Sequence, residues 1–515
     1  MMIVLWIVGG NDLWPTLVVA GMDVPVSRIE LGRSMLEIAF ELDEHSAAPV
    51  FLQLSRAIIA AIDAGRLEPG RKLPGTRALA VSLKIHRNTV DAAYHEAVMQ
   101  GWLVAEPSRG TFVARDLPAM PTAGSIHPGP AAEKGRVRST VSLPTCGGPP
   151  MLFFSDGAPD ARLLPRAELA RAFRRALTTP EFLRASGYGD PRGALALREA
   201  LCEHLSAERG LALAPADILV TRGSQMALFL AAGALLERDE VIAVEEPGYP
   251  LAVTAFRAAG ARVVGVPVDA DGLSVEHLER LAVSEQKLRA VYVTPHHQYP
   301  TTVTMGAGRR IRLLDVARRH GLTIVEDDYD HEYRFDGKPV LPLASRAGDV
   351  PVLYVGSLSK VLAPGIRLGY ATGPVDLLQR MADDRQAIDR QGDVPLEHAV
   401  AILLREGDLG RHARKTRRIY QARRDLLARS LTSKLGAYLD FAIPPGGLAL
   451  WTRLLPGLDA ERWSHEARRH GLAVTPAMSQ CLDLVRAPQA FRLGFASLDD
   501  VETSRAVEIL AMTMP

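Results

Sequence analysis

The sequence predicts a multidomain protein in which a small, mostly helical N-terminal domain precedes a larger α/β domain. The chain has 515 residues, a length that predicts roughly two to four domains rather than one core. Residues 116–150 are rich in Pro, Gly, Ala and Ser, as expected for a linker. The predicted parts are therefore an N-terminal extension at 1–45, a helical domain with a β-hairpin at 46–115, the linker, and an α/β domain at 151–515.

The composition is that of an ordinary globular protein. The hydrophobic fraction is 47%, the charged fraction is 23% and the net charge is +1, which excludes a strongly basic or acidic chain. A nucleic-acid site must therefore arise from local clustering of basic residues. The three cysteines lie far apart without disulfide or zinc spacing, and a reducing cytoplasm is the expected location.

The predicted extension begins with an apolar run at residues 1–20. No Lys or Arg precedes Arg28, and polar or glycine residues interrupt the run at 9–12. We therefore expect neither a signal peptide nor a membrane segment. The extension is expected to be disordered, with Met22 as an alternative start of translation.

The segment 46–115 predicts three helices and a hairpin. Leu54, Ile58 and Ile62 recur at helical spacing, LPGTRALAVSL predicts a second helix, and RNTVDAAYHEAVMQG predicts a third. The stretch WLVAEPSRGTFVA then predicts a β-hairpin with its tip at 108–110. This order of elements is a winged helix-turn-helix.

A cluster of basic residues accompanies the second and third helices. Between residues 66 and 87 the single acid Glu68 faces six basic residues, namely Arg66, Arg71, Lys72, Arg77, Lys84 and Arg87. Such a cluster is typical of a nucleic-acid-binding surface, and side chains at the start of the third helix can reach phosphates and base edges. The alternative is a solvated charged face on which Asn88 or Thr89 only caps the helix.

These segments resemble the GntR family of bacterial regulators. The matching stretches are PVFLQL, GRLEPGRKLPGTRALA, HRNTV, AYHEAVMQGW and RGTFV. The resemblance implies binding to double-stranded DNA through Arg77, His86, Arg87, Asn88, Thr89 and Gly110. Gly75 replaces the family's usual serine, so weaker capping of the second helix is expected, and His86 replaces a small hydroxyl residue.

The C-terminal domain alternates apolar runs with amphipathic segments. The runs are DILVT, EVIAVEEP, ARVVGVPV, AVYVTP, TIVEDD and VLYVGS. They predict βαβ units around a buried, largely parallel sheet, in a large subdomain at about 180–375. Residues 376–515 are mostly helical apart from LALWTRL and FRLGFAS, and they predict a smaller α/β subdomain.

The most informative stretch is VGSLSKVLAPGIRLGY. A predicted strand brings Ser357, Ser359 and Lys360 onto a loop, and Arg367 follows. An amine can form an imine with an aldehyde, while hydroxyl and guanidinium groups at this spacing can hold a phosphate. A lysine in a serine-rich loop is by itself an ordinary surface residue, so this interpretation depends on the neighbouring motifs.

Four further motifs support it. VEDDYDHEYRF ends a strand in acids at 326–328, and a carboxylate there can keep a pyridine nitrogen protonated. These acids could instead bind a metal ion. We do not expect this, because we see no nearby His or Cys at the spacing of a metal site. VTRGSQMALF predicts a helix that begins at Ser224 and Gln225, where free N–H groups favour a phosphate. Tyr249 in EEPGYP follows a Pro-Gly turn and is placed to stack on a flat ring, and Tyr188 in GYGDPRG lies in a Gly-rich loop ahead of a helix. Either tyrosine alone is more simply a packing residue.

Together these stretches resemble the fold-type I aminotransferases, in the family's order, from about Phe153 to the C-terminus. The resemblance implies pyridoxal phosphate as the cofactor, joined to Lys360 as a Schiff base, with Asp327 beside the pyridinium nitrogen. It assigns Tyr329 to the ring hydroxyl, Tyr249 to the ring face, and Ser224, Gln225, Ser357 and Arg367 to the phosphate.

Two more residues are assigned by this resemblance. Tyr188 matches a tyrosine that reaches the phosphate of the partner subunit, which implies a homodimer. Arg492, in FRLGFAS, matches the arginine that binds the α-carboxylate of an amino-acid ligand, a role that suits a bidentate guanidinium.

The clearest departure from the family is TPHHQYPTT. Aminotransferases usually have an Asn-Pro-Thr-Gly-like run here, whose Asn binds the ring hydroxyl, whereas this chain has His297, Gln298 and Tyr299 and lacks the Gly. Which residue of this run contacts the ring hydroxyl stays open. Helix packing with a hydrogen-bonded pair of His296 and His297 is an equally good interpretation.

The fusion of the two modules resembles the MocR subfamily of GntR regulators. It implies a pyridoxal-phosphate-dependent transcriptional regulator whose aminotransferase-like domain senses an amine or amino-acid effector, or pyridoxal phosphate itself. The resemblance also implies a head-to-tail homodimer. The alternative, and the less expected one, is a catalytically active aminotransferase with an accessory DNA-binding domain.

Overall fold

The computed structural model describes residues 6–9, 12–15, 40, 48–115, 151–185, 187–336 and 340–515. The chain divides into two units, Met1–Ser142 and Leu143–Pro515, which are considered separately. Most of the predicted extension and the predicted linker at 116–150 lie outside the described residues. Within the extension, β1 (Trp6–Gly9) and β2 (Asp12–Pro15) pair antiparallel.

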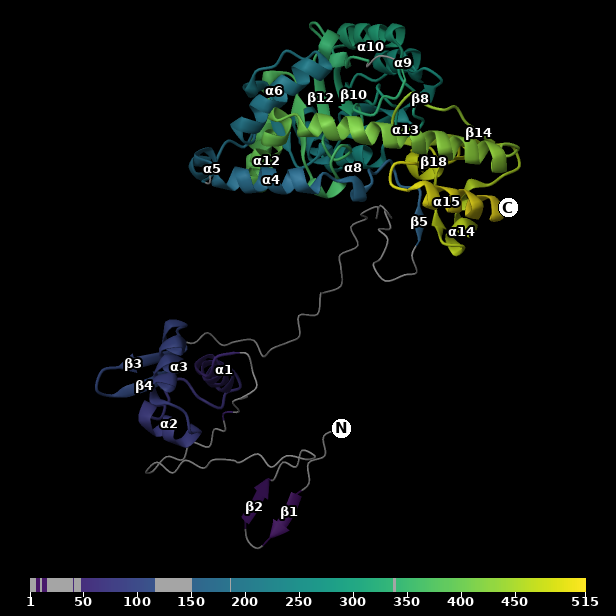
Figure 1. The fold of residues 1–515 in the computed structure, drawn as a ribbon. Coiled ribbons are helices and arrows are strands. Elements are labelled where there is room, and N and C mark those ends of the chain that lie inside the picture. Colours follow the sequence, from purple (N-terminus) through teal and green to yellow (C-terminus); the bar gives the residue numbers. More distant parts are fainter. Residues whose placement is uncertain are drawn as a thin grey trace. The chain divides into compact units, whose positions relative to one another are not determined.

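The first unit contains a winged helix-turn-helix, as predicted. Its elements are α1 (Val50–Asp63), α2 (Thr76–Leu83), α3 (Arg87–Met99) and the wing strands β3 (Leu103–Glu106) and β4 (Gly110–Val113) (Figure 1). Leu54 and Ile58 of α1 pack with Val90 and Tyr94 of α3 in its core. Each pair lies four residues apart, the spacing that places apolar side chains on one face of a helix.

The turn between α2 and α3 is built by local backbone chemistry. Lys84 ends α2 in the left-handed conformation, and His86 precedes α3 with its Nδ1 accepting a hydrogen bond from the Asn88 backbone N–H at 3.2 Å. Gly75 stands at the N-cap of α2, where the described residues supply no side-chain cap. This agrees with the weaker capping expected from the sequence.

The second unit is organised around an eight-stranded sheet in the order β6-β13-β12-β11-β10-β7-β8-β9. The strands from β12 to β8 run parallel, whereas β13 is antiparallel to both of its neighbours. The largely parallel sheet is therefore confirmed. Its strands are β6 (Leu219–Thr221), β13 (Gly369–Thr372), β12 (Val352–Ser357), β11 (Thr323–Asp328), β10 (Leu288–Val293), β7 (Val241–Glu246), β8 (Arg262–Asp269) and β9 (Gly272–Leu273).

Helices cover both faces of this sheet. In β10, Ala290 and Tyr292 pack on one face while Val291 and Val293 pack on the other, because successive strand side chains point in opposite directions. A sheet buried on both faces needs continuous apolar runs, which explains the sequence pattern. The helices are α7 (Ser224–Leu235), α8 (Pro250–Ala258) and α11 (Val375–Asp389) on the first face, and α9 (Val275–Ser284), α10 (Ala307–His320), α6 (Leu195–Arg209) and α12 (Val394–Arg405) on the second. Beside α12 lie α4 (Arg166–Thr178) and α5 (Pro180–Ala185).

The smaller subdomain follows the long helix α13 (Asp408–Leu435) (Figure 1). Its sheet has the order β14-β15-β18-β17, and Trp463 lies fully buried in its core. The strand β5 (Leu152–Phe153) pairs with β16 (Leu472–Ala473), so the start of the domain joins the C-terminal subdomain. The remaining elements are β14 (Leu439–Asp440), β15 (Ala449–Leu454), α14 (Ala460–Arg469), β17 (Thr475–Pro476), β18 (Ala490–Gly494) and α15 (Asp500–Met512). Among the described residues, no helix combines the length and apolarity needed to cross a membrane.

Candidate functional site

A cavity of about 250 Å³ lies where β11 and β12 end and α7 begins. The carboxyl ends of parallel strands meet at one edge of a sheet, so residues that follow different strands converge there. Eight of the predicted cofactor residues line this cavity, namely Lys360, Asp327, Tyr329, Tyr249, Ser224, Gln225, Ser357 and Arg367. Local motifs that are far apart in the sequence therefore share one site.

Lys360 lies in the turn that follows β12. Its Nζ donates a hydrogen bond to the backbone oxygen of Asp156 at 3.1 Å. Burial lowers the pKa of the Lys360 amine, against the opposing effect of the negatively charged Asp156. The neutral amine, which is the form that attacks an aldehyde, is thereby favoured.

Asp327 lies near the end of β11 and is buried. The Tyr292 hydroxyl donates to its Oδ2 at 2.9 Å, whereas Oδ1 finds no hydrogen-bond partner among the described residues. Burial, together with the negative charges of Asp328 and Asp330, raises the pKa of Asp327 to about 7. Of the three acids at 326–328, Asp327 lines the cavity, while Glu326 accepts backbone N–H groups of Leu343 and Ala344.

Groups that suit a phosphate gather at the start of α7. Gly223 has a φ of +74°, and a Cβ there would lie 3.0 Å from Nη1 of Arg367. Glycine therefore lets the guanidinium pack against the first turn, where the N–H groups of a helix are free. Ser224 begins the helix, and Ser357 lines the same cavity.

Tyrosines surround the remaining wall. Tyr249 precedes α8, and its ring meets Tyr299 edge to face at 5.1 Å between centroids. Tyr299 is the residue of the HQYPT run that lines the cavity. His297 instead bonds Asp330 through Nδ1 at 2.7 Å, and its backbone oxygen accepts the Tyr329 hydroxyl at 2.9 Å.

Arg492 projects from β18 and is buried. Its Nε donates to Oδ1 of Asp156 at 2.9 Å, its Nη1 donates to the backbone oxygen of Pro300 at 2.8 Å, and its guanidinium lies 4.7 Å from the centre of the Tyr299 ring. The Arg492 side chain is 1% exposed, while that of Asp156 is 49% exposed. The guanidinium of Arg492 is thus buried beside the cavity and pairs with a half-exposed carboxylate.

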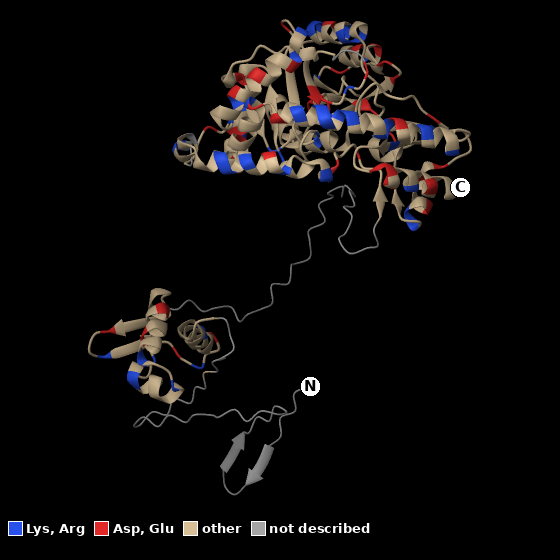
Figure 2. Cartoon of the chain, in the orientation of Figure 1, with Lys and Arg blue, Asp and Glu red and all other residues tan. Residues whose placement is uncertain are grey.

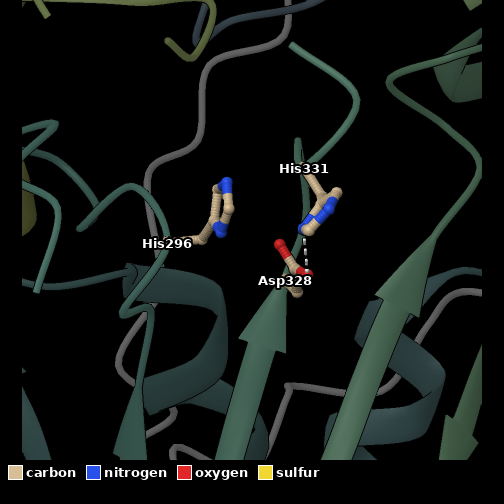
Figure 3. A group of neighbouring side chains, drawn as sticks. All are labelled: His296, Asp328 and His331. Carbon is tan, nitrogen blue, oxygen red and sulfur yellow. Dashed lines mark hydrogen bonds and ion pairs between the residues drawn. The ribbon is translucent and has the colours of Figure 1, made fainter. Parts of the chain in front are cut away.

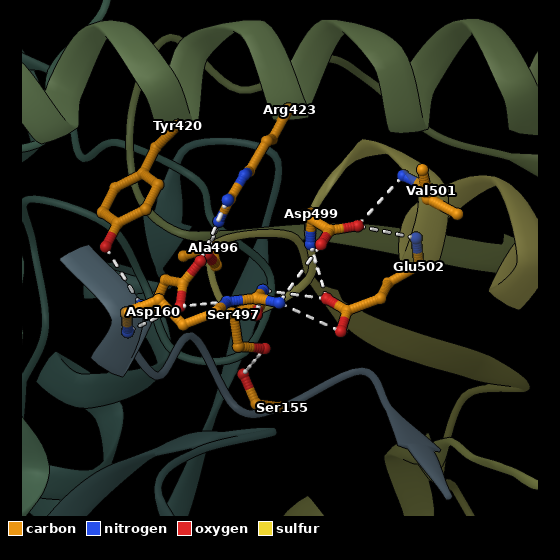
Figure 4. Close-up of polar contacts among 10 residues, drawn as sticks. Ser155, Asp160, Tyr420, Arg423, Ala496, Ser497, Asp499, Val501 and Glu502 are labelled. Atoms are coloured by element: carbon orange, nitrogen blue, oxygen red, sulfur yellow. Dashed lines mark hydrogen bonds and ion pairs between the residues drawn. The ribbon is translucent and has the colours of Figure 1, made fainter.

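The segment that carries Asp156 is fixed on both sides (Figure 4). Ser155 and Ser497 share a hydrogen bond at 3.0 Å, and Asp160 accepts one from Arg423 at 2.9 Å. Gly157 has a φ of +67°, and a Cβ there would lie 3.2 Å from the Leu448 Cβ. These contacts explain how a residue 336 positions away in the sequence reaches Arg492.

Tyr188 does not line the cavity that contains Lys360. It is 82% exposed, its ring lies 4.5 Å from the guanidinium of Arg390, and it lines a separate cavity of about 490 Å³.

The predicted DNA contacts lie on the surface of the winged helix-turn-helix. Arg77, His86, Arg87, Asn88 and Gly110 are exposed, and Thr89 is half-buried. Figure 2 shows basic residues on and around α2. The Arg87 Nε lies 3.4 Å from the Asp91 Oδ2, in an exposed pair that offers little stability and leaves the guanidinium available to a phosphate.

Comparisons with known proteins match both units. Residues 154–510 match the family model of aminotransferase class I and II, and residues 52–113 match that of bacterial regulatory proteins of the gntR family. The probable rhizopine catabolism regulatory protein MocR of Rhizobium meliloti is 31% identical over 467 residues, which span 89% of this chain and 92% of that protein. The chain belongs to the MocR family of transcriptional regulators. A MocR-type regulator joins a DNA-binding helix-turn-helix to a domain of a pyridoxal-phosphate-dependent family.

Two further relatives agree with this. The pyridoxine biosynthesis transcriptional regulator PdxR of Corynebacterium glutamicum is 30% identical over 397 residues, covering 77% of this regulator and 82% of that protein. The solved structure of LysN, an α-aminoadipate aminotransferase from Thermus thermophilus in complex with N-(5'-phosphopyridoxyl)-L-leucine, matches with a TM-score of 0.64 and 29% identity, over 70% of this chain and 92% of that one.

Several site residues of this MocR-family chain were missed by the sequence reasoning. Tyr292 and Thr294 line the cavity at the end of β10, the strand beside β11, and their position at a strand end was the available signal. Asp156 carried no comparable signal. The interpretation of the 326–328 acids as having no His nearby was incomplete, because His331 follows Asp328 by three residues and bonds it at 3.0 Å.

Proposed function

We propose that this regulator binds pyridoxal phosphate at Lys360 and uses it to sense a small amine or amino acid. The observation that supports the proposal most is the convergence of eight cofactor-type residues on one cavity with Arg492 close by. The unpaired, buried Oδ1 of Asp327 is also what a protonated ring nitrogen requires as a partner.

Each residue has a separate task in this proposal. When bound, pyridoxal phosphate supplies an aldehyde that condenses with amines and a ring that withdraws electrons. Lys360 provides the amine, Asp327 keeps a proton at the ring nitrogen, and Tyr249 covers the ring. Arg367 and Ser224 hold the phosphate, through the guanidinium and the start of α7.

Arg492 sets the chemistry of the effector. A guanidinium binds a carboxylate through two parallel hydrogen bonds. Lys360 and Arg492 both contact Asp156, so an effector that carries an amine and a carboxylate could engage both side chains. A sulfonate or another anion also satisfies an arginine. Such an effector would take the place of Asp156 on Arg492.

The signal would then reach the DNA-binding domain through a homodimer. Asp156 lies shortly after the predicted linker, so its release acts on the start of the domain. The exposed Tyr188 is available to the phosphate of a partner subunit in a head-to-tail dimer. The effector would bias the dimer between arrangements that present the DNA-binding domains differently.

The cofactor part of the proposal is tested by visible absorption of the purified full chain after loading with pyridoxal phosphate. The wild type is expected to show the absorption of a lysine-bound cofactor, Lys360→Ala to lose it, and Lys415→Ala, an exposed lysine on α13, to keep it. Equal absorption in the wild type and in Lys360→Ala would overturn this assignment.

The regulatory part is tested by two measurements on the same protein. Transamination is measured with a panel of amino donors, and binding is measured to the DNA upstream of the protein's own gene. We expect sequence-specific DNA binding that responds to an amine, with slow or absent turnover. Fast transamination without sequence-specific binding would favour the aminotransferase alternative.

A further inference from the structure

Three buried side chains outside the cofactor cavity converge on one point. His296 follows β10, Asp328 ends β11, and His331 comes three residues later. One ligand atom from each lies within 4.8 Å of the others, and the three residues are 3%, 5% and 6% exposed. Figure 3 shows the Asp328 carboxylate below the two imidazole rings and joined to His331 by a hydrogen bond. The centroids of the two rings are 4.4 Å apart.

Three polar atoms of this cluster lack a hydrogen-bond partner in the ranges that the structure describes, whereas Nδ1 of His331 and Oδ2 of Asp328 are bonded to each other at 3.0 Å. Both ring nitrogens of His296 and Oδ1 of Asp328 are buried and accept or donate no hydrogen bond within the described part of the chain. Buried polar groups are nearly always paired, because an unpaired one costs about 1–3 kcal/mol. These three atoms therefore require a bound ion or molecule as a partner, because the described residues supply none.

We propose that His296, Asp328 and His331 bind a divalent transition-metal ion, with Zn²⁺ as the expected ion. Two imidazoles and one carboxylate, without a thiolate, form a donor set suited to Zn²⁺ and its first-row neighbours. Bonds of about 2.0–2.2 Å in a tetrahedral site place ligand atoms roughly 3.4 Å apart. The observed spacing closes to that value by side-chain rotations that shift an atom by about 1 Å.

The surroundings orient the carboxylate. The Tyr354 hydroxyl donates to Oδ2 of Asp328 at 2.7 Å, which leaves Oδ1 for the ion. Hydrogen bonds of this kind to a metal-binding carboxylate fix its direction. The Arg209 Nε lies 3.8 Å from Asp328 Oδ2, but Arg209 also pairs with Glu332 at 2.7 Å. Arg310 also acts on His296 and Asp328. The carboxylates of Asp328 and Glu332 therefore balance two guanidiniums, and the surroundings carry no excess positive charge against a cation.

A cavity adjoins the cluster at His331. His331, Arg209 and Glu332 line a cavity of about 360 Å³ beside α13. Three protein ligands leave a fourth position on a tetrahedral ion. The cavity is lined as well by arginines of α13, namely Arg411, Arg414 and Arg417, so hydroxide or another anion is the expected fourth ligand.

The test is a metal titration of the full chain after removal of its affinity tag and treatment with a chelator. Co²⁺ is followed by its visible absorption, and Zn²⁺ is then added to displace it. We expect one ion per chain for the wild type, and an affinity at least about tenfold weaker for His296→Ala and for His331→Ala. His470→Ala, at an exposed histidine of the smaller subdomain, is expected to bind like the wild type.

Folding of the variants is checked by thermal unfolding and by the absorption of the lysine-bound cofactor, with His296→Gln as a variant that conserves volume. The absence of a stoichiometric ion in the wild type would overturn the proposal. Equal affinities in the wild type and both histidine variants would also overturn it, and a buried water would then be the partner of the unpaired atoms.

Discussion

Asp156 accepts a hydrogen bond from the Arg492 guanidinium, to which we propose that the effector carboxylate binds. Removing the Asp156 side chain should therefore strengthen carboxylate binding. The Arg492 Nε donates to Asp156 Oδ1 at 2.9 Å. A ligand carboxylate that approaches Arg492 has to break this contact first. We therefore predict that Asp156→Ala binds a simple carboxylate more tightly than the wild type.

The size of the effect follows from the exposure of the pair. A charge-assisted hydrogen bond contributes about 1.5–3 kcal/mol when it is well shielded. The Asp156 side chain is 49% exposed, so solvent screening reduces its contribution. About 1 kcal/mol then remains as the competition that a ligand must overcome. Its removal corresponds to roughly a fivefold gain in affinity.

The assay is isothermal titration of the cofactor-loaded full chain with maleate, a carboxylate without an amine. Asp156→Asn, which keeps the shape but loses the charge, should lie between the wild type and Asp156→Ala. Arg492→Gln should abolish maleate binding in either background. An Asp156→Ala affinity equal to or weaker than the wild type, with Arg492→Gln still inactive, would refute the competition while leaving the role of Arg492 intact.

Three further predictions concern stability and DNA binding. Burial raises the pKa of Glu245 to about 7, so the folded chain holds a proton that the unfolded chain loses above about pH 4.5. This group therefore lowers stability as the pH rises from there through about 7, by up to about 3 kcal/mol. In thermal unfolding of cofactor-free protein from pH 4 to 8, Glu245→Gln should show a smaller fall than the wild type, because Asp327 and Glu326, whose pKa values are also raised to about 7, keep their share; an equal fall in both proteins contradicts the prediction. A fluorescence anisotropy assay should show that Arg87→Ala weakens operator binding and makes the negative slope of log K against log salt concentration less steep by about 1. Arg56→Ala on α1 should change neither the affinity nor the slope. Trp463→Ala should reduce the free energy of unfolding of the C-terminal unit by about 3–5 kcal/mol in a denaturant titration, because this side chain is fully buried; a loss below about 1 kcal/mol would show that the core refills the space.

The central sheet was predictable because a sheet that is buried on both faces needs continuous apolar runs, and these runs are visible in the sequence. Each of the six apolar runs became a strand between β6 and β12. The antiparallel strand Gly369–Thr372 was not predicted as a separate element, since it is short and follows the Lys360 loop closely. Two-residue strands such as Leu152–Phe153 are too short to show an alternating pattern.

The gathering of the proposed cofactor residues around one cavity was predictable for a related reason. Ser357, Lys360 and Arg367 lie within eleven positions of one another, so a single strand and its loop bring their chemistry together. The two histidines of the proposed metal site lie 35 positions apart on segments that follow different strands. Their approach depends on the parallel register in which Val293 of β10 pairs with Glu326 of β11.

The contact between Asp156 and Arg492 could not be predicted from local sequence motifs. Arg492 was assigned from the stretch FRLGFAS, but the group that occupies it comes from 336 positions earlier. Two pairings create the contact, because β5 joins β16 and β18 lies between β15 and β17. A pattern of residue types does not specify which strand end meets which loop across such a separation. The role that we propose for Asp156 could therefore be inferred only from the fold.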